Sequence, residues 1–247
     1  MHTLSQALLA FVVRVGPAFA LGMVLLALFR RMPQVRIVLY LAMFILLRDA
    51  MTPLGLWSFG TSGFFWIRLH DNAAFLIAFG MACLGLTVAL YVCDRENRSL
   101  VTWTRGGWGT GTLVGLVGVL VVVGPLAVAY RHVPIAARGG LVPHDLLLPT
   151  LVFALLGNLL EEALFRGYVY GWLIQTMRPL SAAVVSGVVF AFCHSYLATT
   201  VTGVGYPLLV FTLWEGTIAG VVGAKCGVLP AALTHGGAIF LLSSGLI

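Results

Sequence analysis

Charged side chains are scarce in this sequence, and their scarcity excludes a water-soluble protein. Only 9% of the 247 residues are charged, whereas 60% are hydrophobic. A soluble domain carries about 25% charged residues, because water must solvate its surface. A lipid-facing chain can form only helices or a closed barrel. The apolar runs extend over about 20 residues without alternating polarity, so they predict an all-α protein with several membrane-spanning helices.

Cysteine is sparse too, and it is scattered without the CxxC spacing of a disulfide or metal framework. We therefore expect the four cysteines to be packing residues. The net charge of +6 would suggest a nucleic-acid partner in a soluble protein. Here the basic residues gather at the ends of apolar runs and form no continuous basic face, so no nucleic-acid partner is expected.

Two protease motifs are missing, which narrows the chemistry. The sequence has no HExxH zinc motif and no pair of aspartates in two spans. The run Gly60-Thr61-Ser62-Gly63 imitates the GxSG of serine proteases. It falls in a predicted external loop, where glycine, serine and threonine are ordinary turn residues, so we interpret it as a turn.

Eight apolar runs predict eight transmembrane helices within one membrane domain over residues 1–247. Residues 1–143 would hold the N-terminal spans, and residues 144–247 the core spans. The first run is expected to be a retained span, because it lacks a convincing cleavage site. Glycines at small-xxx-small spacing, as at Gly216 and Gly220, predict close helix packing. The predicted spans are 5–29, 35–57, 71–93, 110–130, 144–165, 180–200, 206–224 and 228–246.

The basic residues are distributed unevenly among the loops. With the N-terminus outside, nine lie in inner loops and three in outer loops. Cytoplasmic loops retain positive charge, so we expect a multi-pass protein of the plasma (inner) membrane with both termini outside. The inner nine are Arg30, Arg31, Arg36, Arg95, Arg98, Arg105, Arg166, Arg178 and Lys225, and the outer three are Arg68, Arg131 and Arg138. Arg14 and Arg48 fall within spans and are not counted.

Two adjacent glutamates lie inside the fifth predicted span. A carboxylate at bilayer depth costs about 2.5–3.5 kcal/mol, so each one requires an explanation. Glu162 and Arg166 are four residues apart, share a helix face and can form an ion pair. Glu161 points about 100° away around the helix, beyond easy reach of Arg166. Glu161 is therefore expected to be the unpaired carboxylate, suited to act as a general base for water.

Two histidines in later spans give this glutamate partners. His194 ends the run Phe190-Ala191-Phe192-Cys193-His194, and His235 lies in the last predicted span. A lone histidine in a helix is commonly a packing residue, but two of them downstream of paired glutamates suggest a shared site. Glu161, His194 and His235 could bind a water, deprotonate it and stabilise the oxyanion formed at a peptide carbonyl.

These motifs resemble those of the CAAX-protease and bacteriocin-processing (CPBP, or Abi) family. That family comprises glutamic-type intramembrane endopeptidases and includes the Rce1-type prenyl-protein proteases. The resemblance covers residues 145–246 and rests on EExxxR, then FxxxH, then a histidine in the last span. The matching residues are Glu161, Glu162 and Arg166, then Phe190 and His194, then His235.

The resemblance implies that Glu161 and His194 activate the water and that His235 helps to hold the oxyanion. Glu162, Arg166 and Phe190 would be supporting residues. One position departs from the family: Asn or Asp usually stands four residues after the last histidine, and here it is Ile239. Isoleucine donates no hydrogen bond, so either another group completes the oxyanion site or catalysis is weakened. Glu215 and Ser243 are the candidate substitutes.

We therefore predict a protease that cleaves near the C-terminus or membrane tail of a membrane-attached protein or peptide. No cofactor is expected. Zinc held by the same glutamates and histidines is a less favoured alternative, because an ion-paired carboxylate is a poorer ligand. The main alternative from another class is a non-catalytic member that binds a membrane partner, or a transporter that uses the same buried charges. The transporter lacks the expected inverted repeat.

Overall fold

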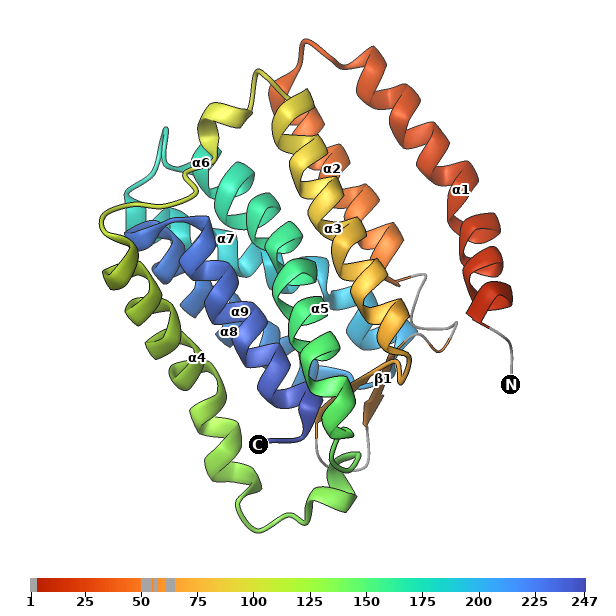
Figure 1. Cartoon of the computed structure of the whole chain (residues 1–247). Helices are drawn as coiled ribbons and strands as arrows, with labels where there is room; N and C mark the ends of the chain where they lie inside the picture. The colour runs from red at the N-terminus through yellow and green to blue at the C-terminus, as the bar shows by residue number, and fades with distance from the viewer. Residues whose placement is uncertain (1–3, 50–54, 56, 61–64) are drawn as a thin grey trace.

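The structure is a computed structural model, and it describes residues 4–49, 55, 57–60 and 65–247. Eight helices of at least 15 residues run back and forth through this part of the chain (Figure 1). Each predicted span corresponds to one of them, so the prediction of an all-α membrane protein is confirmed. They are α1 (Leu4–Leu28), α2 (Pro33–Asp49), α3 (Ala73–Cys93), α4 (Trp108–Tyr130), α5 (His144–Glu162), α7 (Pro179–Cys193), α8 (Tyr206–Cys226) and α9 (Val228–Ser244).

The number of full-length spans is smaller than predicted. Six helical stretches among the described residues are long and apolar enough to cross a membrane, instead of eight. Helices α2 and α9 have 17 residues each. Such a helix rises about 25 Å, less than the roughly 30 Å of a hydrocarbon core. The predicted span 35–57 was too long, because α2 ends at the charged residues Arg48 and Asp49.

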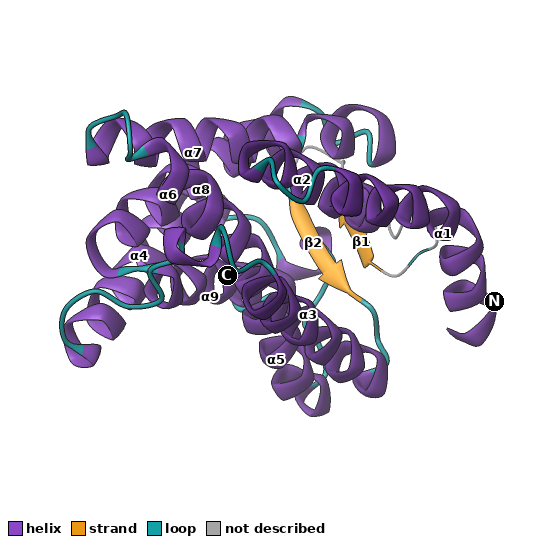
Figure 2. Ribbon diagram, turned by 90° about the horizontal axis from the view of Figure 1, so that it is seen from above, coloured by secondary structure: helices purple, strands orange, loops and turns teal. Residues whose placement is uncertain are grey.

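A β-hairpin follows α2 and was not predicted. Strands β1 (Trp57–Gly60) and β2 (Trp66–Leu69) pair antiparallel, with Trp57 opposite Leu69. The hairpin lies between α2 and α3 when the molecule is seen from above (Figure 2). Arg68 holds it in place by donating to the backbone carbonyls of Arg138 (2.6 Å) and Leu242 (2.8 Å). Burial of this guanidinium, together with the charge of Arg138, lowers the pKa of Arg68.

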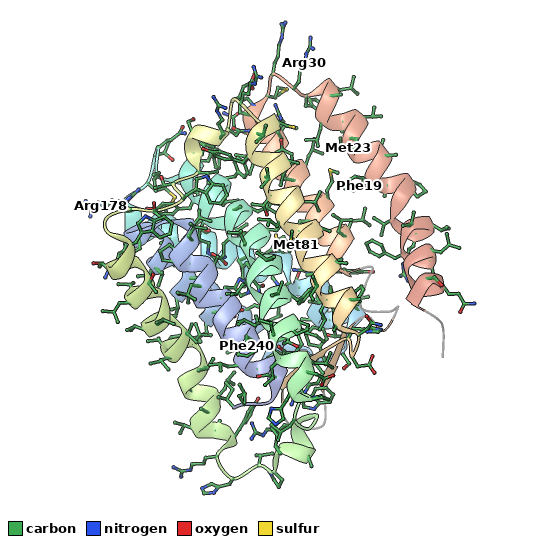
Figure 3. The ribbon with its side chains drawn as sticks, in the orientation of Figure 1. Phe19, Met23, Arg30, Met81, Arg178 and Phe240 are labelled. Carbon is green, nitrogen blue, oxygen red and sulfur yellow. The ribbon has the colours of Figure 1, made fainter. Side chains whose placement is uncertain are left out.

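Helix α5 does not end where the fifth span was predicted to end. It continues through a π-helical segment, Ala163–Val169, and the short helix α6 (Tyr170–Leu173). Arg166 is therefore buried inside this continuous stretch instead of lying in a loop. Removing it from the inner loops changes their count of basic residues from nine to eight (9 − 1 = 8), still against three. Arg30 and Arg178 lie along the same end of the bundle in Figure 3; the orientation itself stays a prediction.

The C-terminal helices pack closely through glycines. Helix α9 lies between α4 and α5 (Figure 1). The predicted close packing at Gly216 and Gly220 is confirmed, since a methyl group on Gly220 would lie 2.6 Å from the carbonyl oxygen of Ala183. On the partner helix α7, a methyl group on Gly187 would lie 2.9 Å from the backbone of Gly216. Helices α7 and α8 therefore touch through their backbones.

This contact makes Gly187→Ala a sharp test of the helix packing. The added methyl group would press against backbone atoms of α8, which cannot move aside as a flexible side chain does. We expect a loss of about 1–3 kcal/mol, as for other overpacked cores, seen as a lower melting temperature in detergent. Gly124→Ala in α4 is the matched control, because no described atom lies within 4 Å of its added carbon. Equal melting temperatures for the two variants would contradict the close α7–α8 contact.

Candidate active site

The three residues predicted to share a site come from three helices and line one cavity. Glu161 lies in the last turn of α5, His194 directly follows α7, and His235 lies midway along α9. The cavity has a volume of about 320 Å³. Its walls are mainly apolar and include hairpin residues such as Phe59 and Ile67. The hairpin thus closes one side of the chamber that holds the charged groups.

Glu161 and His194 face each other at a distance that leaves room for a small molecule. Oε2 of Glu161 lies 4.0 Å from Nε2 of His194. Nδ1 of His194 lies 2.8 Å from the Phe190 carbonyl oxygen, which can only accept a hydrogen bond. Nδ1 is therefore the donor, which leaves Nε2 as an acceptor in the neutral ring. Within the described part of the chain, Oε2 of Glu161 has no hydrogen-bond partner.

Glu162 is the paired glutamate, as the spacing predicted. Its Oε1 accepts from Nη1 of Arg166 at 2.8 Å, and neither side chain is exposed. Arg166 also donates to the Gly216 carbonyl at 2.5 Å and lies over the Phe190 ring at 4.8 Å. The EExxxR and FxxxH motifs are thus joined by Phe190, whose ring also lies 4.3 Å from that of His194. Glu162, Arg166 and Phe190 form the layer behind the cavity.

His235 has two carboxylate neighbours, an arrangement that we did not predict. Its Nδ1 lies 2.8 Å from Oε1 of Glu162, and its Nε2 lies 3.5 Å from Oε2 of Glu215. Glu215 is 1% exposed and lines the cavity, as does Ile239. Ser243, the other candidate substitute, donates to the Phe240 carbonyl at 3.4 Å. Of the two, Glu215 is the one that reaches the histidine.

Arg48 is a cavity residue that the sequence interpretation missed. It was set aside as a basic residue inside a span, although an arginine at bilayer depth is itself a signal of function. Its Nη2 donates to the Cys193 carbonyl at 2.6 Å, and its Nε donates to Asp49 at 2.7 Å. Aromatic packing of Phe44 on α2 against Phe165, with ring centroids 6.1 Å apart, brings α2 to the site.

Three further predictions, on a metal site, the GxSG-like run and the cysteines, have different outcomes. Among the described residues, no three His, Cys, Asp or Glu side chains form a metal-binding group, and metal dependence stays a question for experiment. The GxSG-like run is only partly covered: Thr61, Ser62 and Gly63 lie outside the described residues. Of the cysteines, Cys83, Cys193 and Cys226 are buried thiols, in agreement with their expected role as packing residues, whereas Cys93 is exposed.

The fold and the cavity define a multi-pass helical membrane protein with a buried cluster of glutamates and histidines. Residues 143–241 match the sequence model of a family described as type II CAAX prenyl endopeptidase Rce1-like. This segment contains Glu161, His194 and His235 and begins just before α5. The resemblance indicated by the motifs is therefore confirmed: residues 143–241 are similar to the Rce1-like family. Comparisons with curated proteins and with solved structures gave no match.

Proposed function

We propose that this protein is a glutamic-type intramembrane endopeptidase. Its substrate would be a membrane-attached protein or peptide, cleaved near the C-terminus or within the membrane tail. The observation that carries the proposal is the placement of Glu161 and His194 across 4.0 Å at the wall of an apolar cavity. That gap is too long for a direct hydrogen bond and suits a bridging water.

The proposed hydrolysis uses the two hydrogen-bond acceptors, Glu161 and Nε2 of His194. A water in the gap donates one hydrogen to Glu161 and the other to Nε2 of His194, so its lone pairs face the substrate. As Glu161 takes the proton, the water oxygen bonds to the scissile carbonyl carbon, and the carbonyl oxygen becomes an oxyanion. The proton then passes to the leaving amide nitrogen, the carbon–nitrogen bond breaks, and Glu161 returns to its ionised form.

The cavity lining supports a lipid-embedded substrate. Apart from the charged cluster, the walls are built from aromatic and aliphatic side chains. An apolar chain segment can pass from lipid into such a cavity without exposing its apolar surface to water, an exposure that would cost about 25 cal/mol per Å². We therefore propose that the substrate reaches the site with an apolar tail or attached lipid already in the bilayer. The plasma membrane, with the N-terminus outside, is the proposed location.

A non-catalytic role is the second candidate, and Ile239 is the observation that favours it. This apolar side chain lines the cavity where relatives usually carry a hydrogen-bonding residue. A member with a disabled site could still bind membrane-attached tails. It would bind a substrate peptide without converting it.

The experiment that separates the two uses protein purified in detergent and a panel of membrane-anchored peptides, with and without a lipid group on the tail. We expect cleavage products, identified by mass spectrometry, from wild type but not from His194→Ala. Gel filtration would check that the variant remains folded. Binding without cleavage by wild type would support the non-catalytic role and overturn the proposed hydrolysis.

Treatment with a chelator tests the zinc alternative directly. In the proposed mechanism Glu161 accepts the proton of the water, and no metal takes part. Treatment with EDTA followed by gel filtration should therefore leave the cleavage rate within about twofold of that of the untreated enzyme. The control is EDTA-treated protein supplied again with zinc. Loss of cleavage on treatment and its return with zinc would show that the glutamates and histidines act as metal ligands.

A further inference from the structure

The proposed hydrolysis creates an oxyanion, and the groups around His235 argue against this histidine as its main donor. Both ring nitrogens already face carboxylates, Glu162 at 2.8 Å and Glu215 at 3.5 Å. An oxyanion at Nε2 would have to approach the Glu215 carboxylate, and like charges in a poorly hydrated cavity repel strongly. Ile239 supplies no donor. The transition-state charge therefore requires another partner.

Arg48 has the chemistry that this role requires. Its side chain is 92% buried, since 8% is exposed, and it lines the same cavity as Glu161 and His194. Two of its three nitrogens are engaged by Asp49 and Cys193, whereas Nη1 has no hydrogen-bond partner among the described residues. A buried, charged donor without a partner costs stability. A protein can retain such a destabilising group at a functional site, where a ligand or a transition state supplies the missing hydrogen-bond partner.

Its neighbours also position Arg48 relative to the reacting groups. Nη2 donates to the carbonyl of Cys193, the residue directly before His194. The Asp49 carboxylate binds Nε, and the guanidinium lies 5.1 Å from the Phe44 ring centroid. Arg48, Glu161 and His194 all line the same cavity. The guanidinium is thus held from two sides, with one nitrogen left over, beside the proposed water-activating pair.

We propose that Arg48 is the catalytic residue that binds the oxyanion of the tetrahedral intermediate, through Nη1. This inference rests on the proposed hydrolytic function. As the water oxygen bonds to the carbonyl carbon, the electron pair of the C=O bond moves to oxygen and is met by the Arg48 charge. Arginine gives up no proton in this step, and the charge on oxygen returns to the C=O bond when the carbon–nitrogen bond breaks. His235 then positions Glu162 and Glu215.

The test compares Arg48→Gln and Arg48→Lys with wild type on a cleavable peptide. Loss of an interaction that is made only in the transition state lowers kcat and leaves KM unchanged. We expect Arg48→Gln to lower kcat by about 10²–10³-fold, the effect of losing one oxyanion donor. Arg48→Lys should lose about tenfold, because an ammonium cannot replace a guanidinium held at two of its nitrogens. Arg36→Gln is the matched control: it lies on the same helix but pairs with Asp94 at 3.3 Å, and its kcat should not change.

A binding measurement distinguishes the oxyanion role from a merely structural one. A peptide phosphonate, which mimics the tetrahedral intermediate, should bind Arg48→Gln about 10²–10³-fold more weakly than wild type. The uncleaved substrate peptide should bind catalytically inactive Glu161→Gln protein equally well with and without the Arg48 change. If Arg48→Gln does not fold, Arg48→Lys decides the question: wild-type kcat and phosphonate affinity in that variant would overturn the role of Arg48.

The outcomes also separate this inference from the function on which it rests. Cleavage that depends on Glu161 but not on Arg48 would refute the oxyanion role and leave the endopeptidase standing. Absence of any Glu161-dependent cleavage would refute both. Ile239→Asn should change kcat by less than about threefold if Arg48 already binds the oxyanion. A rise of tenfold or more would show instead that the donor is missing at residue 239.

Discussion

Glu161→Gln is expected to lower the rate of peptide hydrolysis by about 10²–10⁴-fold, the usual contribution of a general base. Glutamine has nearly the same shape as glutamate but cannot accept the proton of the attacking water. The neighbouring His194 would keep its hydrogen bond to the Phe190 carbonyl, so the rest of the site should stay in place. The loss should appear in kcat, because the substrate contacts the apolar walls in either protein.

The Glu161→Gln variant should be at least as stable as wild type, so a loss of activity could not be attributed to unfolding. Glu161 has an oxygen without a hydrogen-bond partner in the described structure, and a buried charge of this kind costs stability. An amide there removes that cost, so the melting temperature in detergent should stay equal or rise. Glu96→Gln, at an exposed loop position, is the matched control and should leave both quantities unchanged. A Glu161→Gln protein that cleaves at the wild-type rate would exclude the proposed mechanism.

Arg166→Met, unlike Glu161→Gln, is expected to destabilise the folded protein. Glu162 and Arg166 are both fully buried and lie 2.8 Å apart. Removing one partner of a buried ion pair typically costs about 3–5 kcal/mol, because the other charge is left uncompensated. The change also removes the hydrogen bond to the Gly216 carbonyl, which ties the π-helical segment to α8. We expect a large fall in melting temperature and in the yield of monodisperse protein.

A second substitution tests the cause of that instability. In the double variant Arg166→Met with Glu162→Gln, the orphaned carboxylate is gone, so part of the lost stability should return. Arg105→Met is the control, because Arg105 also donates to a backbone carbonyl, that of Ala224 at 2.9 Å, but at an exposed position. If the double variant is less stable than Arg166→Met alone, the ion pair is not the source of the effect.

The adjacent residues Glu161 and Glu162 thus have different roles, and helix geometry explains why. Glu161 and Glu162 point about 100° apart around α5, so one faces the cavity and the other faces the core behind it. Glu162 finds Arg166 and His235 there, both at 2.8 Å. Among the described residues, the ion-pair contact of Glu161 is with the more distant His194, at 4.0 Å. The first arrangement stabilises the fold, and the second leaves a carboxylate available for chemistry.

Features that depend on local pattern could be predicted from the amino-acid sequence. Apolar runs of helical length located the eight helices, with most ends within a few residues. Four-residue spacing on one helix identified the Glu162–Arg166 ion pair, because such neighbours share a face whatever surrounds them. The scarcity of charge in lipid singled out Glu161, His194 and His235, which do line one cavity. Each of these inferences needed only short stretches of chain.

Contacts between distant residues could not be predicted in this way, because they depend on how the helices pack. The β-hairpin that lines the cavity forms because β1 pairs with β2, and strands this short show little alternation of polar and apolar residues. Glu215 reaches His235 because α8 packs against α9, and Arg48 reaches the His194 region because α2 packs against the π-helical segment. These contacts depend on how side chains pack between helices, and residue spacing along the chain does not predict that packing. The carboxylates and histidines were readable from sequence, while the partners that complete their bonding were not.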